Sequence, residues 1–246
     1  MSKTQRSRFA FGVMVGLLCV PLVARAQEFG YYGPLGPSFW PALSPAWTVC
    51  GTGEIQSPID FGRLTLLTHR TRRLAADYGP TTGEIFNNGH TIEIETAGTN
   101  VLSLDSVDYE LDQFHFHTPS EHRFDGRGFD MEMHLVHKSP AGGTAVVGMF
   151  LKRGPSSGAL SAVFENLPEV DAPLNTRTSL PPFDLRTFLP QSQSNYRYLG
   201  SLTTPPCTEG VVWVVLEEVV TVSDEDIAQF ARRIAFNARR VQRQSR

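Results

Sequence analysis

The sequence predicts a mainly β fold with a few peripheral helices, and three patterns indicate it. Between residues 84 and 151, short runs alternate apolar and polar side chains with turn residues between them, as half-covered strands do. Residues 211–216 form an unbroken apolar run, which is typical of a central strand covered on both faces. Helical periodicity is clear in only one long stretch, residues 223–235.

The expected strands follow one another closely along the chain. They cover residues 84–88, 91–96, 101–104, 108–117, 130–138 and 144–151. Asp125-Gly126-Arg127-Gly128 has the composition of a loop tip, so the strands on either side of it are expected to form a hairpin.

The helix at residues 223–235 has Ser223 as its N-cap and three acidic residues in its first turn. Its apolar face consists of residues at helical spacing: Ile227, Phe230, Ala231 and Ile234. A second helix is expected within residues 157–166. Residues 27–60 are rich in glycine, proline and aromatics and are expected to form an irregular arm packed on the domain. The basic residues 239–246 are interpreted as a solvated terminus.

The first residues predict export. Residues 2–8 carry three basic side chains, residues 9–23 are mainly apolar, and Ala24-Arg25-Ala26 has the form of a signal-peptidase site. The apolar run is shorter than the ~20 residues that a membrane span needs, and Pro21 interrupts it. Residues 1–26 are therefore interpreted as a cleaved signal peptide.

Cleavage would leave residues 27–246 as one domain, periplasmic or secreted. It removes four of the 22 basic side chains and none of the 25 acidic ones, so the net charge falls from −3 to −7. An acidic exported domain is a poor candidate for nucleic-acid binding. No second apolar run is long enough to hold the cleaved chain in a membrane.

Three cysteines become two when the signal leaves. Cys50 and Cys207 are then an even pair in an oxidising compartment, where a disulfide is the default expectation. The alternative is two unpaired buried thiols. A lipid anchor at Cys19 is a rival interpretation, but the bulky Leu18 precedes it where a small residue is expected.

Five of the seven histidines fall within one short region. In Gln113-Phe114-His115-Phe116-His117 polar residues alternate with phenylalanine, so on a strand the three polar side chains share one face. On the next strand His134 shares a face with Glu132 and Val136, and the hairpin can bring it beside the first pair. Three imidazoles whose ligand atoms lie about 3.3 Å apart can hold zinc and leave its fourth position open, as in catalytic sites.

Gln113 and Glu132 stand two residues before His115 and His134, on the same faces. Each can accept the free N–H of the neighbouring imidazole and so fix its tautomer and direction. A Glu132 carboxylate left unpaired among apolar residues would be costly.

The other two histidines of this region are not expected to bind the metal. His137 faces away from His134 on a regular strand and is interpreted as structural. His122 lies beside Glu121 where a strand gives way to a loop, and is interpreted as a hydrogen-bonded support.

Several blocks of the sequence resemble the α-class carbonic anhydrases, in the family's order. The blocks are Gln56-Ser-Pro-Ile-Asp60, Asn87-Asn-Gly-His90, Gln113-Phe-His-Phe-His-Thr-Pro-Ser-Glu-His122, Met131-Glu-Met-His-Leu-Val-His137 and Ser201-Leu-Thr-Thr-Pro-Pro-Cys207. The wording Thr-Pro-Ser-Glu-His and the paired cysteines resemble the bacterial exported branch. The resemblance implies a single domain around a large, mostly antiparallel twisted central sheet, cis peptide bonds before Pro58 and Pro206, and a homodimer for which the sequence indicates no interface.

The resemblance also implies an activity, the reversible hydration of carbon dioxide to bicarbonate and a proton. Zn²⁺ on the three histidines would supply a zinc hydroxide, as is known for carbonic anhydrase. Thr203 would accept a hydrogen bond from that hydroxide and donate its own to Glu121, whose carboxylate can only accept. His90, in a turn, would relay the released proton, because an exposed imidazole has a pKa near 6.5.

The same resemblance assigns the pocket walls. The apolar wall for the substrate would comprise Val136, Val146, Leu202, Val211 and Trp213, with Thr204 beside them. The polar wall, which orders water toward His90, would comprise Tyr31, Asn88, Gln113 and Thr204. Glu93 stands where the family usually has a neutral amide, and Thr144 where an apolar residue is common, so an altered rate or inhibitor profile is expected.

Two other functions fit a site of three histidines. A zinc-binding protein without catalysis would need the ligands, but His90, Glu121 and Thr203 would be superfluous in it. A metalloenzyme of the cupin kind would usually add a carboxylate or a fourth histidine as ligand. An enzyme that hydrates carbon dioxide is therefore the favoured interpretation.

Overall fold

The computed structural model describes residues 28–63, 69–71, 73–156 and 158–243. The predicted signal peptide lies outside these ranges. Strands dominate and helices are few and short, which confirms the mainly β fold class. Within the described ranges no helix is long and apolar enough to cross a bilayer.

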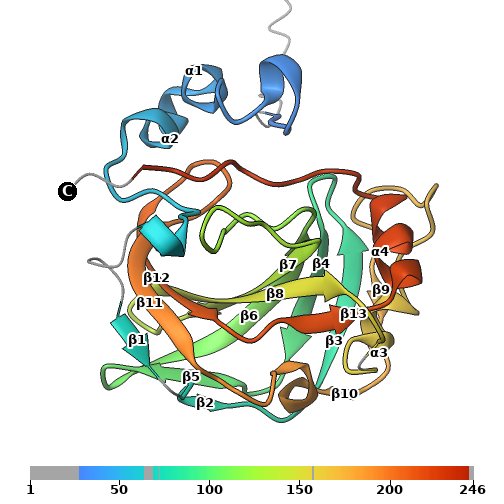
Figure 1. The fold of residues 1–246 in the computed structure, drawn as a ribbon. Helices are drawn as coiled ribbons and strands as arrows, with labels where there is room; N and C mark the ends of the chain where they lie inside the picture. Colours follow the sequence, from blue (N-terminus) through green and yellow to red (C-terminus); the bar gives the residue numbers. More distant parts are fainter. Residues whose placement is uncertain (1–27, 64–68, 72, 157, 244–246) are drawn as a thin grey trace, which may run out of the picture.

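One large twisted sheet forms the body of the domain (Figure 1). Its strands are β1 (His69–Thr71), β2 (Ala76–Asp77), β3 (Pro80–Asn87), β4 (Ile92–Ala97), β5 (Val101–Leu104), β6 (Val107–His117), β7 (Met131–Lys138), β8 (Thr144–Arg153), β9 (Thr178–Ser179), β10 (Phe183–Asp184), β11 (Asn195–Ser201), β12 (Glu209–Leu216) and β13 (Val220–Val222). Neighbours run in the order β1-β11-β12-β8-β7-β6-β4-β3-β10. Pairing is antiparallel except that β12 and β13 both run parallel to β8.

The six predicted strands are all present, as β3 to β8, and their ends differ from the prediction by a few residues. The predicted turn at Asp125-Gly126 joins β6 to β7, and both residues have positive φ. The apolar run 211–216 lies in β12, between β11 and β8, which confirms a central strand. β11 itself is not predicted, because its residues mix tyrosines with polar side chains and glycine.

The helices lie around the sheet. They are α1 (Trp40–Leu43), α2 (Val49–Thr52), α3 (Ser161–Phe164), α4 (Asp224–Ala231) and the 3₁₀ turns η1 (Gly33–Leu35), η2 (Pro45–Trp47), η3 (Phe61–Arg63) and η4 (Leu185–Phe188). Ser223 caps α4 in a reciprocal pair of bonds with Asp226, as its position predicts. The helix ends four residues before the predicted residue 235, because the chain then turns to bring Asn237 against Thr118.

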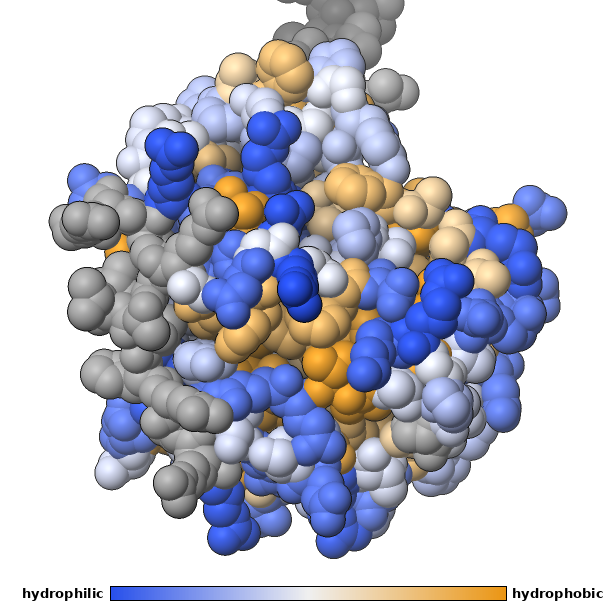
Figure 2. Space-filling model, in the orientation of Figure 1, coloured by the Kyte–Doolittle hydropathy of each residue, from blue (hydrophilic) through white to orange (hydrophobic). Residues whose placement is uncertain are grey.

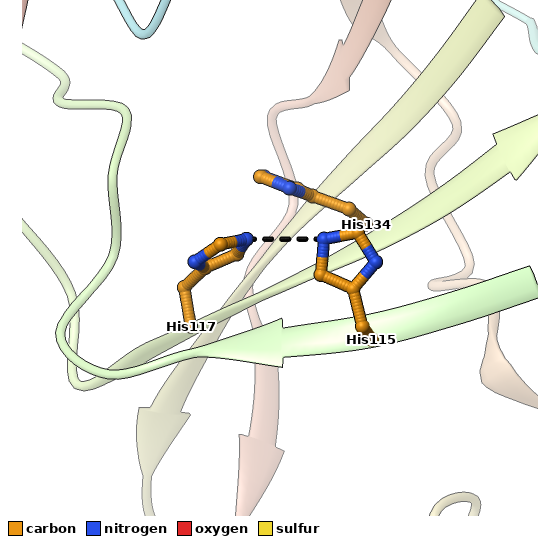
Figure 3. Close-up of side chains that lie close together, drawn as sticks. All are labelled: His115, His117 and His134. Atoms are coloured by element: carbon orange, nitrogen blue, oxygen red, sulfur yellow. Dashed lines mark hydrogen bonds between the residues drawn. The ribbon is translucent and has the colours of Figure 1, made fainter. Parts of the chain in front are cut away.

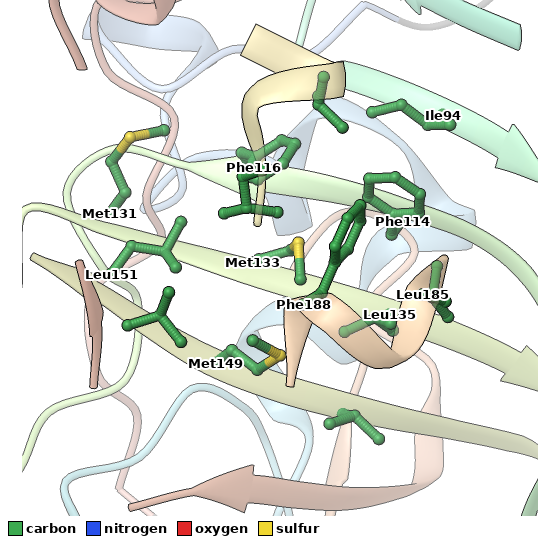
Figure 4. Close-up of a cluster of buried hydrophobic side chains, with 14 of the residues drawn as sticks. Ile94, Phe114, Phe116, Met131, Met133, Leu135, Met149, Leu151, Leu185 and Phe188 are labelled. Atoms are coloured by element: carbon green, nitrogen blue, oxygen red, sulfur yellow. The ribbon is translucent and has the colours of Figure 1, made fainter. Parts of the chain in front are cut away.

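Strict side-chain alternation divides the apolar residues into two groups on opposite faces of the sheet. On one face, Phe114 and Phe116 of β6 pack with Met133 and Leu135 of β7 in the main core (Figure 4). On the other face, Val136 and Val146 pack with Trp213 in a smaller cluster. The side chains of His115, His117 and His134 therefore project from this second face of the sheet, beside its apolar cluster.

Most of the arm, residues 28–60, lies above the sheet at the top of the view in Figure 1. Short helical turns joined by irregular segments make up the arm, where an irregular arm without helices is expected from the sequence. Several of its large apolar side chains are exposed, among them Tyr32 and Phe39. In the face shown in Figure 2, apolar surface gathers in the middle of the view, with hydrophilic side chains around it.

The segment after α4 corrects one prediction. A solvated terminus is predicted from residue 239 onward, yet the side chain of Arg239 is buried and only 2% exposed. Residues 236–242, here called the strap, run between the arm and the end of β6 (Figure 1). Polar groups of the arm bind the guanidinium, so a basic sequence alone is a poor guide to exposure here.

Candidate metal centre

Three imidazoles meet on the second face of the sheet (Figure 3). β6 and β7 are paired so that His115 lies directly opposite His134, and His117 lies opposite Glu132. The Nε2 atoms of His115 and His117 are 3.1 Å apart, close to the separation expected of two zinc ligands. One nitrogen from each of the three rings falls within 4.8 Å of the others.

Each ring is held through its other nitrogen. His115 Nδ1 lies 2.8 Å from Gln113 Oε1, and His134 Nε2 lies 2.9 Å from Glu132 Oε1, as the spacing predicts. His117 Nδ1 lies 2.7 Å from the main-chain oxygen of Asn237, a partner that the sequence does not reveal. With these acceptors in place, Nε2 of His115, Nε2 of His117 and Nδ1 of His134 remain as the ligand atoms.

The protonation of the rings suits a metal. Burial lowers the pKa of His115 well below its usual value, and the nearby His117 and His134 rings lower it further. Burial also lowers the pKa of His117, although Glu121 opposes this. Neutral imidazoles are the form that coordinates a metal, so the donor set fits zinc.

Glu132 accepts hydrogen bonds from four groups. Besides His134, Oε1 lies 2.6 Å from His122 Nδ1, while Oε2 accepts the main-chain N–H groups of Glu121 and His122 at 2.9 and 2.8 Å. Burial opposes ionisation of Glu132, but His122 and His134 outweigh it and hold its pKa well below the usual range. His122 Nε2 lies 2.6 Å from the Tyr198 hydroxyl, so the contacts agree with a supporting role for His122.

His137 faces the main core, as predicted. It is fully buried, and its Nε2 lies 2.7 Å from the hydroxyl of Tyr78. Burial lowers the pKa of His137 to about 4.

This shift predicts a pH dependence of folding. The unfolded chain takes up a proton on His137 near pH 6.5 and the folded chain only near pH 4, so the stability associated with the neutral ring is lost as the pH falls through this window. The loss can reach about 3 kcal/mol. Urea unfolding of the zinc-free protein between pH 7 and 4.5 should give a shallower pH dependence for His137→Gln than for the original chain. Parallel curves would contradict the prediction, since the other histidines are common to both proteins.

Glu121 Oε1 lies 3.6 Å from His117 Nδ1, and Glu121 is 1% exposed. Its Oε1 accepts the main-chain N–H of Arg239 at 2.8 Å. Its Oε2 has no hydrogen-bond partner among the described residues, so the bond expected from Thr203 is not formed in this structure. That oxygen is nevertheless a buried acceptor with a free position.

A pocket of about 220 Å³ is lined by two of the imidazoles, those of His115 and His134. Residues predicted for its walls do line it: Gln113, Val136, Val146, Leu202, Thr203, Thr204 and Trp213. Val211 does not line it and packs in the apolar cluster with Trp213. Two charged residues at the rim, Asp112 and Lys138, are missed by the sequence reasoning. Thr144 does not line the pocket, but its Oγ1 accepts a hydrogen bond from Lys138 Nζ at 2.9 Å.

The residues expected to carry protons lie farther out. His90 stacks on Phe29 of the arm, with ring centroids 3.9 Å apart, and burial lowers its pKa while Glu28 partly opposes the shift. Asn88 accepts the main-chain N–H of His90 at 2.9 Å and donates to Glu93. Tyr31 lines a separate pocket with Glu121.

Glu93 lies opposite His115 in the pairing of β4 with β6 and so shares the metal-site face. Burial raises its pKa, and the negative charges of Glu95 and Asp112 add to the rise, while the hydrogen bond from Asn88 opposes it. The departure from a neutral amide therefore places an acidic group beside the metal centre.

The disulfide prediction agrees with the structure. Cys50 of α2 is bonded to Cys207, with the Cα atoms 5.0 Å apart. The Cys207 N–H donates to Thr204 O at 2.8 Å, so the bridge joins the arm to the loop that carries Thr203. The peptide bonds before Pro58 and Pro206 are cis, as expected, and so is the one before Pro119.

Comparison with known proteins identifies the family. The family of eukaryotic-type carbonic anhydrases matches residues 35–246. The chain belongs to the α-carbonic anhydrase family. The sequence resemblance is thereby confirmed over most of the chain, well beyond the blocks around the histidines.

The relatives include bacterial carbonic anhydrases of similar length and plant α-carbonic anhydrases. A carbonic anhydrase of Pectobacterium atrosepticum is 36% identical over 92% of this chain and 91% of its own. One of Nostoc is 38% identical over 91% of this chain and 86% of its own. The solved α-carbonic anhydrase of Thermovibrio ammonificans, in complex with sulfanilamide, gives a TM-score of 0.83 at 36% identity, covering 89% of this chain and 97% of that one.

The same fold also occurs under another name. Dioscorin, solved in complex with ascorbate, gives a TM-score of 0.80 at 32% identity, covering 88% of this chain and 94% of that one. The fold alone therefore does not decide what the metal centre does, and the residues have to be considered one by one.

Proposed function

We propose that this α-carbonic anhydrase catalyses the reversible hydration of carbon dioxide with a zinc ion on His115, His117 and His134. One observation carries the proposal. Three imidazoles present one nitrogen each to a common point, the other nitrogen of each is held by a separate acceptor, and a pocket lined by His115 and His134 opens beside them. Three ligands and an open side are the arrangement of a catalytic rather than a structural zinc.

Zinc bound there would lower the pKa of a water ligand to about 7 and so supply the nucleophile for carbon dioxide. Gln113, Glu132 and the Asn237 carbonyl hold the three rings in the tautomer and direction that binding requires. The protein therefore contributes a rigid donor set before any metal arrives.

Thr203 and Glu121 would orient the nucleophile. Oε2 of Glu121 is free to accept, and a carboxylate cannot donate, so a Thr203 hydroxyl bonded to it must point its proton away from the pocket. The Thr203 hydroxyl oxygen then offers only a lone pair toward the pocket. The nucleophile must donate its hydrogen bond to that lone pair, and this fixes the direction of the nucleophile. Carbon dioxide, small and apolar, would rest against Val136, Val146 and Trp213.

His90 would carry the released proton to solvent. Its partly exposed ring is neutral at pH 7, because its pKa lies below the usual value, and it can accept a proton through ordered water. The position is secured by Asn88, which binds the main-chain N–H of His90, and by the ring of Phe29.

Replacing His90 with alanine is expected to lower kcat about tenfold or more in weak buffer, because proton release then lacks its relay. kcat/KM for carbon dioxide should change little, since the replaced ring lies outside the substrate pocket. Stopped-flow assays with added imidazole should restore part of kcat. An unchanged kcat would remove His90 from the proton path.

Export completes the proposal. The basic and apolar start of the chain, the disulfide and the bacterial relatives support a protein that acts outside the cytoplasm after loss of residues 1–26. Mass spectrometry of the exported protein should find Gln27 at its N-terminus.

Stopped-flow carbon dioxide hydration with a pH indicator tests the activity itself. The zinc-loaded chain should exceed the buffer rate by orders of magnitude, and a sulfonamide should inhibit it. A protein that binds zinc stoichiometrically yet hydrates no carbon dioxide would be a metal-binding member of the fold without this catalysis.

A further inference from the structure

Asn237 of the strap binds the His117 ring and main-chain groups of Thr118, Phe116 and His90. Its main-chain oxygen accepts from His117, and its Oδ1 accepts the main-chain N–H of Thr118 at 2.7 Å. Its Nδ2 donates to the main-chain oxygens of His90 and Phe116 at 3.0 and 2.8 Å. The position of the strap therefore bears directly on a metal ligand.

Two residues further along the strap, Arg239 binds Glu121. Its main-chain N–H donates to Glu121 Oε1 at 2.8 Å, 118 residues away in sequence. This bond leaves Oε2 of the same carboxylate free for Thr203. A shift of the strap would therefore turn the Glu121 carboxylate and move the acceptor on which Thr203 depends.

The guanidinium of Arg239 fastens the strap to the arm. Nη1 donates to Gln56 Oε1 at 3.0 Å and to Ser57 O at 2.7 Å, and Nη2 donates to Cys50 O at 2.9 Å. The Trp40 ring lies 5.6 Å from the guanidinium carbon. All of these partners belong to the arm, which the disulfide at Cys50 joins to the loop of Thr203.

Burying a guanidinium is costly, and within the described part of the chain this side chain forms no ion pair with a carboxylate. Burial lowers the pKa of Arg239 to about 10, and Glu121 only partly opposes the shift. A planar fork with several donors can satisfy three oxygens in fixed directions, whereas an ammonium group cannot reach all three from one point. The geometry thus needs arginine rather than a basic side chain in general.

We propose that Arg239 is a positioning residue of the metal centre, whose guanidinium locks the strap to the disulfide-bonded arm so that the strap holds Glu121 and His117 in place. This inference rests on the proposed hydration of carbon dioxide for its kinetic effect, but not for its effect on zinc. Arg239 itself touches neither the substrate pocket nor the ligand atoms.

Arg240 provides a matched control. It is the next residue of the strap, carries the same charge, and has an exposed side chain. Arg239→Met keeps the apolar stem and leaves three arm oxygens unpaired, while Arg239→Lys keeps the charge. Arg240→Met removes the same charge without touching the arm contacts described here.

The first experiment measures kcat and kcat/KM of zinc-saturated proteins well below their melting temperatures. Arg239→Met and Arg239→Lys should each lose about tenfold in kcat/KM, and Arg240→Met less than about twofold. In a Glu121→Gln background, Arg239→Met should cost less than about twofold, because its effect passes through Glu121. Equal losses in both backgrounds, or no loss in either, would overturn the proposal.

The second experiment follows zinc release into a chelator and needs no activity. Arg239→Met should release zinc about tenfold faster than Arg240→Met, since His117 loses the fixed position of its acceptor. Equal release rates for the two variants would refute the link to His117. If the original chain hydrates no carbon dioxide, the proposed function fails while zinc release still decides the role of Arg239; if Arg239→Met does not fold, Arg239→Lys carries both measurements.

Discussion

His134→Ala is expected to bind zinc so weakly that dialysed protein carries almost none, and carbon dioxide hydration should fall by roughly a thousandfold or more. Two imidazoles remain, and they lie on one strand, so the metal loses its only ligand from β7. Loss of a hydrogen-bond partner around a ligand typically costs about 10–100-fold in affinity, and loss of the ligand itself should exceed this. The Glu132 carboxylate also loses one of its four donors while staying buried.

Metal analysis after dialysis and stopped-flow assays at defined zinc concentration measure both effects. His90→Ala is the control, because it removes an imidazole that is not a ligand and should keep a full equivalent of zinc. A His134→Ala protein that retained one zinc per chain with the original affinity would show that the ion binds elsewhere.

Thr203→Ala is expected to lower kcat/KM for carbon dioxide by about a hundredfold, with little change in zinc content. Without the hydroxyl, Glu121 Oε2 has no donor to direct, and the nucleophile is free to turn its proton toward the substrate. The loss should appear in kcat/KM, because orientation matters in the transition state more than in substrate binding.

Thr204→Ala is the matched control for this substitution. Thr204 has the same side chain and lines the same pocket, but it has no assigned role with Glu121. Its replacement should cost less than about tenfold. If both threonines cost the same, the proposed pairing of Thr203 with Glu121 would lose its support.

The parts of the centre that the sequence predicts are those governed by local periodicity. Alternation in β6 and β7 places His115, His134 and their partners Gln113 and Glu132 on one face, because a strand has a period of two. The hairpin then fixes their approach, and the paired register has His115 opposite His134. Nothing beyond neighbouring residues is needed for that inference.

The parts that escape prediction depend on main-chain groups far away in sequence. The Asn237 oxygen and the Arg239 N–H belong to the main chain, which hardly differs from one residue to the next. Such groups leave no signature in side-chain patterns. Arg239 is wrongly expected in solvent because its buried surroundings consist of carbonyl oxygens from the arm. β11 and β13 escape for a related reason, since their place beside β12 and β8 is set by packing across the sheet.

The strap also sets the order in which the metal centre can be completed during synthesis. The three ligand histidines lie in mid-chain, but His117 is held by a residue 120 positions later and Glu121 by one 118 positions later. A chain still emerging from the ribosome can therefore form the β6–β7 hairpin long before these groups arrive. A protein cut before residue 237 would keep all three histidines, and Gln113 and Glu132 would still hold two of them. It would lose the carbonyl that holds His117 and the N–H that holds Glu121.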